Sequence, residues 1–388
     1  MSRTYQVISA DSHLETSENF WPRYLPQKYL ERAPRLVALE DGGEGWLVEG
    51  QPLYHNSRII FGGRKPIRTS GVSYFNDDGS PAPGTGGPAQ RLREQDEDGI
   101  DAEVLFPSVQ GTRLIWGISD PRVYLALVQG YNDFLAKEFC SLAPDRLLGV
   151  GVIPISGIDD AVRELERCKE LGLKAVTFHT FPNGGGTPKP EDDRFWKTAL
   201  DLQMPLAPHI TFGDARPPPP TAAMRGKENF TVHLGGLSGG EPDCIYCISQ
   251  LLVDRVFDRF PDLRFMFAET NAGWMPFTFY MLDDKYDIYR GAFNEEFKKR
   301  PTEYINEHLY FSFVRDPMAM KLREFLPVDN LMWSSDFPHG VTSFPESRKW
   351  IDIVFEGVPG PVKRKVLVDN AVNFFGLDSA KAITPTPD

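Results

Sequence analysis

The sequence predicts an α/β protein that forms a (β/α)8 barrel of the TIM type, with long insertions at the carboxyl ends of the strands. Two observations support this prediction. Eight short runs of β-branched or apolar residues recur along the 388 residues, and amphipathic stretches with helical spacing separate most of them. Strands that alternate with helices pair in parallel, and eight such units close most simply into a barrel. The alternative is a doubly wound open sheet, but no glycine-rich phosphate loop follows any of the runs.

The predicted strands have clear bounds in the sequence. They are residues 5–10, 102–107, 147–154, 174–179, 205–210, 264–269, 309–313 and 331–336. Between them, segment 159–172 shows the helical pattern, because its apolar residues fall on one stripe and Gly172 ends it. Segments 193–203 and 250–260 have the same spacing. We therefore expect helices to link the strands.

Two segments interrupt the regular alternation. Residues 40–90 and 213–243 are rich in glycine and proline, and the second contains four consecutive prolines at 217–220, which cannot lie inside a helix. Both segments follow predicted strands, and long loops in a compact domain are usually functional. We expect one domain over residues 1–388, with these two insertions near the mouth of the barrel and a frayed tail at 380–388.

Composition narrows the classes of function. Hydrophobic residues make up 41% and charged residues 25% of the chain, which is typical of a globular protein, and the formal net charge is −12. This charge argues against binding to nucleic acid or to an anionic membrane surface. No apolar run approaches the roughly 20 residues that span a bilayer. The first residues lack the apolar core and cleavage site of a signal peptide, so we expect a cytoplasmic protein.

Titratable residues gather where the predicted strands end. Five of the eight strands end in residues that can bind a metal or move a proton: Asp11 with His13, His179, His209, Glu269 and Asp336. In a barrel these residues would face one bowl. Asp11 and His13 lie two residues apart, so an extended strand projects both to the same side. Each residue alone has a plainer interpretation as a turn former or a packed histidine, but together they predict one divalent ion, Zn²⁺ or Mn²⁺.

Further residues are candidates for binding a substrate near such an ion. His339 follows Asp336 by three residues and would orient that carboxylate or the substrate. Trp274 follows the sixth predicted strand and would form a wall of the site, although helix–sheet packing is the ordinary role of a tryptophan. His179 and Arg113 complete the predicted substrate-binding set. Arg113, like Arg58 and Arg64 in the first insertion, could bind a carboxylic acid.

Several motifs together resemble a known family. They are DSH at 11–13, LAPHITFG at 206–213, FPDLRFMFAETNAGW at 260–274, LMWSSDFPHG at 331–340 and NAVNFFGL at 370–377. In this order they resemble the amidohydrolase-related (amidohydrolase 2) family, which includes aminocarboxymuconate-semialdehyde decarboxylase and non-oxidative aromatic acid decarboxylases. The likeness runs from about residue 5 to about residue 376.

The resemblance implies a (β/α)8 barrel that holds one divalent metal, and a homodimer. Its metal ligands fall on Asp11, His13, His209 and Asp336, with Asp336 also transferring protons. The family usually has a histidine as the acid–base on strand six, and here Glu269 occupies that position. A carboxylate can transfer protons if its pKa is tuned, but it cannot present an imidazolium cation. The presence of Glu269 in place of the usual histidine therefore leaves the type of reaction undecided.

Three functions follow from these expectations. The first is a metal-dependent decarboxylase of a small aromatic or enol carboxylic acid, with Glu269 or Asp336 as proton donor. The second is a metal-dependent hydrolase of an amide, ester, lactone or activated C–C bond, in which the ion generates hydroxide. The third is a non-catalytic binding protein, which would not need so many titratable strand ends.

Overall fold

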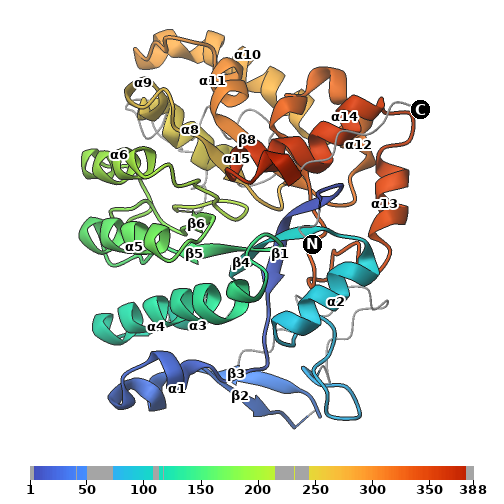
Figure 1. The fold of residues 1–388 in the computed structure, drawn as a ribbon. Coiled ribbons are helices and arrows are strands. Elements are labelled where there is room, and N and C mark those ends of the chain that lie inside the picture. The colour runs from blue at the N-terminus through green and yellow to red at the C-terminus, as the bar shows by residue number, and fades with distance from the viewer. Residues whose placement is uncertain are drawn as a thin grey trace.

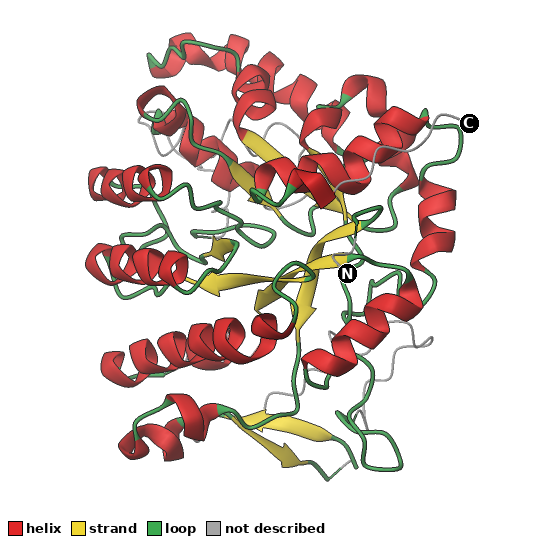
Figure 2. Cartoon of the chain, in the orientation of Figure 1, coloured by secondary structure: helices red, strands yellow, loops and turns green. Residues whose placement is uncertain are grey.

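Parallel strands alternate with helices along most of the chain in the computed structural model (Figures 1 and 2). The structure describes residues 4–40, 42–49, 73–107, 113–116, 118–214, 231 and 244–381. Within these residues no helix has both the length and the apolar character needed to cross a membrane.

Two parallel sheets contain seven of the strands. The first has the order β1-β4-β5-β6 and the second the order β7-β8-β9. Their bounds are β1 Ile8–Leu14, β4 Ala102–Pro107, β5 Leu147–Val152, β6 Ala175–Thr177, β7 Phe265–Phe267, β8 Leu309–Phe313 and β9 Leu331–Trp333. A separate antiparallel hairpin consists of β2 Arg35–Ala38 and β3 Glu44–Leu47. The α/β class with parallel pairing is therefore confirmed.

Short contacts connect the two parallel sheets. Leu206 forms parallel bridges with Val176 of β6 and with Phe265 of β7. At the other edge, His13 N donates a hydrogen bond to Phe337 O (2.8 Å), and Asp336 N donates one to Asp11 O (2.9 Å). These bonds place the chain that follows β9 beside β1.

Helices lie outside these strands. Figure 1 shows α4, α5 and α6 stacked on one side of the first sheet, with α10 and α11 beyond the second sheet. The larger helices are α2 Pro88–Asp98, α4 Pro121–Phe134, α5 Ile158–Glu170, α6 Asp193–Asp201, α8 Cys244–Val253, α10 Met275–Phe293, α11 Pro301–His308 and α13 Ser347–Val354. The shorter ones are α1 Trp21–Tyr24, α3 Arg113–Trp116, α9 Val256–Arg259, α12 Pro317–Lys321, α14 Gly360–Arg364 and α15 Asn370–Phe374.

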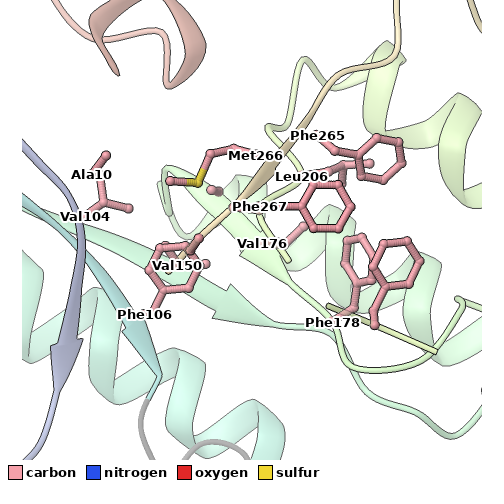
Figure 3. Close-up of a cluster of buried hydrophobic side chains, with 14 of the residues drawn as sticks. Ala10, Val104, Phe106, Val150, Val176, Phe178, Leu206, Phe265, Met266 and Phe267 are labelled. Carbon is pink, nitrogen blue, oxygen red and sulfur yellow. The ribbon is translucent and has the colours of Figure 1, made fainter. Parts of the chain in front are cut away.

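Apolar side chains from successive strands form the core (Figure 3). Ala10 of β1, Val104 of β4, Val150 of β5 and Met266 of β7 are fully buried, as is Leu206 between the sheets. Since each strand contributes side chains to the same cluster, the core fixes the relative positions of the strand ends. Those ends hold the candidate site.

Three sequence predictions need correction. The first strand begins at Ile8 and continues to Leu14, so Asp11 and His13 lie inside it. Segment 205–210 forms only isolated bridges because Pro205 and Pro208 lack the N–H groups that a ladder needs. The predicted helix 250–260 is divided into α8 and α9, because Arg255 adopts a left-handed backbone with φ of 59°. Residues 41 and 50–72 of the first insertion, most of the second insertion at 213–243, and the tail beyond 381 lie outside the described residues.

Candidate metal centre

Strand β1 brings Asp11 and His13 to the end of the first sheet. The two residues are buried, with 0% and 2% of their surfaces exposed. The pairing of β1 with β4 shifts register between Ser9 and Ser12, which is a β-bulge. His13 Nε2 lies 3.6 Å from Asp11 Oδ1, so both side chains face the same point, as the two-residue spacing predicts.

His209 and Glu269 approach this pair from the neighbouring strand ends. His209 Nε2 lies 3.1 Å from His13 Nε2 and 3.8 Å from Asp11 Oδ1. It also lies 3.3 Å from Oε2 of Glu269, the second residue after β7. Four predicted residues from three separate parts of the sequence therefore meet.

Asp336 and His339 enter from the loop after β9. Asp336 Oδ1 lies 3.2 Å from His13 Nε2 and 3.3 Å from His339 Nδ1. The imidazole of His339 also stacks on that of His13, with ring centroids 3.6 Å apart. His339 is therefore a neighbour of both His13 and Asp336.

The backbone is unusual at three of these strand ends. Ile210, Glu269 and Asp336 have φ values of 60°, 57° and 53°, a left-handed region that non-glycine residues seldom adopt. Such conformations require support from the surrounding structure and concentrate at functional sites. These left-handed residues turn the chain sharply beside His209, Glu269 and Asp336, whose side chains meet in the site.

The donor atoms form two overlapping groups. Asp11, His13, His209 and Glu269 have ligand atoms within 4.8 Å of one another, and so do His13, Glu269, Asp336 and His339. The predicted set of Asp11, His13, His209 and Asp336 is thus divided between groups that share His13 and Glu269. The two groups therefore add Glu269 and His339 to the four predicted donors and exclude none of them.

The chemistry of these donors fits a divalent cation. Both carboxylate oxygens of Asp11 are buried and accept no hydrogen bond within the described part of the chain. A buried carboxylate without a hydrogen bond is costly, and a cation would satisfy it. Imidazole nitrogens and carboxylate oxygens are ligands that Zn²⁺ and Mn²⁺ both accept.

The pKa shifts show how burial and the neighbouring carboxylates act on these side chains. Burial, with repulsion from Asp336 and Glu269, raises the pKa of Asp11 well above its ordinary value. Burial and the charge of Asp336 raise the pKa of Glu269 to about 8. Burial, together with the nearby His339, lowers the pKa of His13 to about 4, which keeps its imidazole neutral and able to ligate.

His339 and Asp336 shift in opposite directions. Burial alone would lower the pKa of His339, but the carboxylates of Asp336 and Glu15 raise it to about 10. Burial alone would raise the pKa of Asp336, but His339 and His13 hold it below its ordinary value. This pair therefore behaves as an imidazolium beside a carboxylate.

The remaining predicted residues lie in different surroundings. His179 is exposed and stacks on Trp116, with ring centroids 3.8 Å apart. Trp274 is half-buried at the start of α10, and its Nε1 donates a hydrogen bond to Thr270 O (2.8 Å). The side chain of Arg113 lies outside the described residues, as do Arg58 and Arg64.

Sequence reasoning missed Glu15. Its carboxylate is fully buried, with Oε1 3.8 Å from Nε2 of His339. The signal was present, because Asp11, His13 and Glu15 alternate along the chain as side chains on one face of a strand do. Trp116 was also missed, since nothing in its sequence context indicates that it stacks on His179.

This fold and donor set define a metal-dependent enzyme. A family model described as "Amidohydrolase" matches residues 74–377, and the chain belongs to that family. The predicted resemblance is therefore confirmed.

Curated relatives are decarboxylases of low identity. The gamma-resorcylate decarboxylase of Polaromonas sp. (strain JS666 / ATCC BAA-500) is 25% identical over 303 residues, which cover 74% of this chain and 87% of that protein. The 2-amino-3-carboxymuconate-6-semialdehyde decarboxylase of Dictyostelium discoideum is 26% identical over 302 residues, covering 76% of this chain and 78% of that protein.

A solved structure has the same fold over nearly the whole chain. It is a dihydroxybenzoic acid decarboxylase from Polaromonas sp. JS666 with bound manganese and the inhibitor 2-nitroresorcinol. The TM-score is 0.57 at 18% identity, and the match covers 96% of this chain and 97% of that one. At this identity the likeness establishes the fold.

Proposed function

We propose that the protein is a divalent-metal-dependent, non-oxidative decarboxylase of a small aromatic or enol carboxylic acid. The observation that carries the proposal is the meeting of Asp11, His13, His209, Glu269 and Asp336 at the strand ends. Both curated relatives described above are decarboxylases. The manganese in the related dihydroxybenzoic acid decarboxylase supports one divalent ion, Mn²⁺ or Zn²⁺.

We also infer that the strands close into a (β/α)8 barrel within one domain over residues 1–388. The bridges of Leu206 and the hydrogen bonds between β1 and the chain after β9 support this closure. The predicted homodimer and cytoplasmic location stay predictions. Sedimentation of the purified protein would determine the oligomeric state.

Asp11, His13, His209 and Asp336 are the proposed metal ligands. When bound, the ion would hold the carboxylate and an adjacent hydroxyl of the substrate and withdraw electron density from them. Because the pKa of Glu269 is raised to about 8 before a cation binds, this carboxyl can hold a proton at neutral pH. Glu269 is therefore placed to protonate the substrate carbon. Asp336 is the second candidate, and because its pKa is held below the ordinary value it would first have to take up a proton.

The reaction balances with one proton. The carbon that bears the substrate carboxylate takes a proton from Glu269 or Asp336. The bond between that carbon and the carboxylate then breaks, its electron pair returns to the ring or enol, and CO₂ leaves. The proposed substrate-binding residues are His179, Trp274, His339 and Arg113, with Arg113 as the cation for a second anionic group.

A direct assay tests the proposal. Protein loaded with Mn²⁺ or Zn²⁺ is incubated with a series of hydroxybenzoates that includes 2,6-dihydroxybenzoate, and CO₂ and the decarboxylated phenol are measured. We expect release from at least one acid and its loss in Asp336→Asn. Absence of CO₂ from every phenolic and enolic acid, with metal bound, would refute the decarboxylase.

Hydrolysis is the second candidate function, and Glu269 is the residue that favours it. Glu269 stands where family members usually have a histidine, and a carboxylate is a suitable general base for water. If the protein is a hydrolase, ¹⁸O from labelled water enters the organic product, whereas decarboxylation leaves the oxygens of the phenol product unlabelled. A binding protein without catalysis would instead retain its ligand in Asp336→Asn.

A further inference from the structure

Glu15 is a buried carboxylate that neither proposed reaction uses. It follows β1 directly, none of its surface is exposed, and neither oxygen accepts a hydrogen bond within the described residues. An ionisable group is costly in this setting unless it has a partner or a function. The polar atom that faces it is Nε2 of His339, 3.8 Å from Glu15 Oε1.

His339 is held from three directions. Its Nδ1 lies 3.3 Å from Asp336 Oδ1, its Nε2 faces Glu15, and its ring stacks on that of His13 with centroids 3.6 Å apart. The imidazole thus connects a carboxylate inside the metal centre with a carboxylate behind it. Nε2 of His339 makes no hydrogen bond within the described chain, and the carboxylate of Glu15 is the described acidic group that faces that end of the ring.

The chemistry of the two groups limits where the hydrogen atoms can lie. A carboxylate only accepts hydrogen bonds, so an interaction of Nδ1 with the ionised Asp336 requires the hydrogen on Nδ1. Nε2 can then donate to an ionised Glu15 or accept from a protonated one. The arrangement therefore holds Nδ1–H toward Asp336 in either protonation state of Glu15.

We propose that Glu15 is a positioning residue, which fixes the ring of His339 so that His339 orients the carboxylate of Asp336. The inference rests on the proposed function, in which Asp336 is a metal ligand and a candidate proton donor. Without Glu15, the imidazole can tilt away from Asp336, and this carboxylate can then rotate. Mutation of a residue that supports a metal ligand from behind typically lowers metal affinity or activity by about 10–100-fold.

Two variants separate hydrogen bonding from the remaining effects of the side chain. Glu15→Gln keeps groups that can donate to or accept from Nε2, whereas Glu15→Met has a similar length and can do neither. A matched control is Glu164→Met, since Glu164 is also a buried carboxylate but is bonded to Asn132 and Arg167 between α4 and α5. The control shows what loss of a buried carboxylate does to stability alone.

The measurements do not depend on the substrate. Mn²⁺ affinity is measured by titration, and the ring ¹⁵N and ¹H signals of His339 are measured by NMR after assignment with His339→Asn. In Glu15→Met we expect Mn²⁺ to bind at least about tenfold more weakly and the His339 signals to shift. Both should return toward wild type in Glu15→Gln, and Glu164→Met should change neither.

Opposite results would overturn the proposal. Unchanged His339 signals in a folded Glu15→Met protein would show that Glu15 does not position the ring. If Glu15→Met does not fold, Glu15→Asp provides the test, because it withdraws the carboxylate by one methylene and should shift the same signals. A failure of the CO₂ assay with these ring and Mn²⁺ results intact would refute the decarboxylase while leaving the positioning role of Glu15 in place.

Discussion

At the scale of single residues, the candidate centre brings three carboxylates together, and the imidazolium of His339 is the positive charge beside them. Asp11 and Asp336 are fully buried, and Glu269 lies close enough to raise the pKa of Asp11. Groups arranged in this way favour ligand binding at the expense of stability in the empty protein. Two predictions follow from this balance.

Asp11→Asn should separate metal binding from stability. The amide removes one of the mutually repelling charges, so we expect the metal-free variant to be at least as stable as the wild type. Loss of a direct ligand should weaken Mn²⁺ binding by more than about 100-fold, the upper end for residues that only support ligands. Thermal unfolding of the metal-free protein and Mn²⁺ titration measure the two effects. Wild-type Mn²⁺ affinity in this variant would remove Asp11 from the ligand set.

Metal affinity should depend on pH through Glu269. Its folded-state pKa is raised to about 8 by burial and by Asp336, so it carries a proton below that pH in the metal-free protein. A cation bound nearby favours the ionised carboxylate, so it competes with this proton and lowers the pKa of Glu269 without having to displace the proton completely. Mn²⁺ affinity should therefore rise as the pH increases toward about 8 and level off above it. Titrations across this range should show a smaller dependence in Glu269→Gln, and an equal dependence would contradict the assignment.

At the scale of elements, the loop after β9 depends on close contact with the loop before α2. Gly84 has φ of 80°, and a Cβ at this position would lie 2.3 Å from the Cβ of Pro338. Pro338 lies between Asp336 and His339, so a shift of this loop would move both residues of the candidate centre. Only glycine fits the conformation and the contact together.

Gly84→Ala should therefore affect the site from outside it. We expect a loss of about 1–3 kcal/mol in the free energy of unfolding, together with weaker Mn²⁺ binding. Gly79→Ala is the matched control, because Gly79 has a similar φ of 81° but open space around its Cβ position. Chemical denaturation and Mn²⁺ titration of both variants provide the measurement. Equal Mn²⁺ affinity in the two variants would show that the contact with Pro338 does not support the site.

The strands were largely predictable because each is a short apolar run between polar segments. The predicted 102–107 and 309–313 agree with β4 and β8. The first strand was placed too early, because the polar residues from Asp11 to His13 look like a strand end although the strand buries them. Local sequence does not report that burial, which arises from the bonds to Phe337 and Asp336 at the other end of the chain.

The site residues were predictable for a similar reason, with one limit. Carboxyl ends of parallel strands gather at one edge, so Asp11, His13, His209, Glu269 and Asp336 could be expected to meet. The sequence could not show which donors share a group, because this depends on the left-handed turns at Ile210, Glu269 and Asp336. Glu15 escaped prediction since its role depends on contact with a loop more than 300 residues away.

At the scale of the whole molecule, Arg91 joins the first strand to the last. Its Nη2 donates hydrogen bonds to His13 O (3.1 Å) and Phe337 O (2.9 Å), and its Nε donates one to Glu103 Oε2 (2.6 Å). The side chains of Arg91 and Glu103 are each only 3% exposed. One guanidinium thus connects α2, β1, β4 and the loop that holds Asp336.

Arg91→Met should destabilise the entire fold, because it leaves the Glu103 carboxylate buried without its cation and removes the hydrogen bonds that Arg91 donates to the carbonyls of His13 and Phe337. Breaking a buried ion pair in this way typically costs about 3–5 kcal/mol. Lys197→Met is the control, since Lys197 forms an exposed pair with Asp201 on α6 and its loss should cost less than about 1 kcal/mol. Chemical denaturation of both variants measures the difference. Because Arg91 also connects β1 to the chain after β9, Arg91→Met should weaken Mn²⁺ binding as well. Similar stabilities for the two variants would show that the connection between β1 and the chain after β9 does not depend on Arg91.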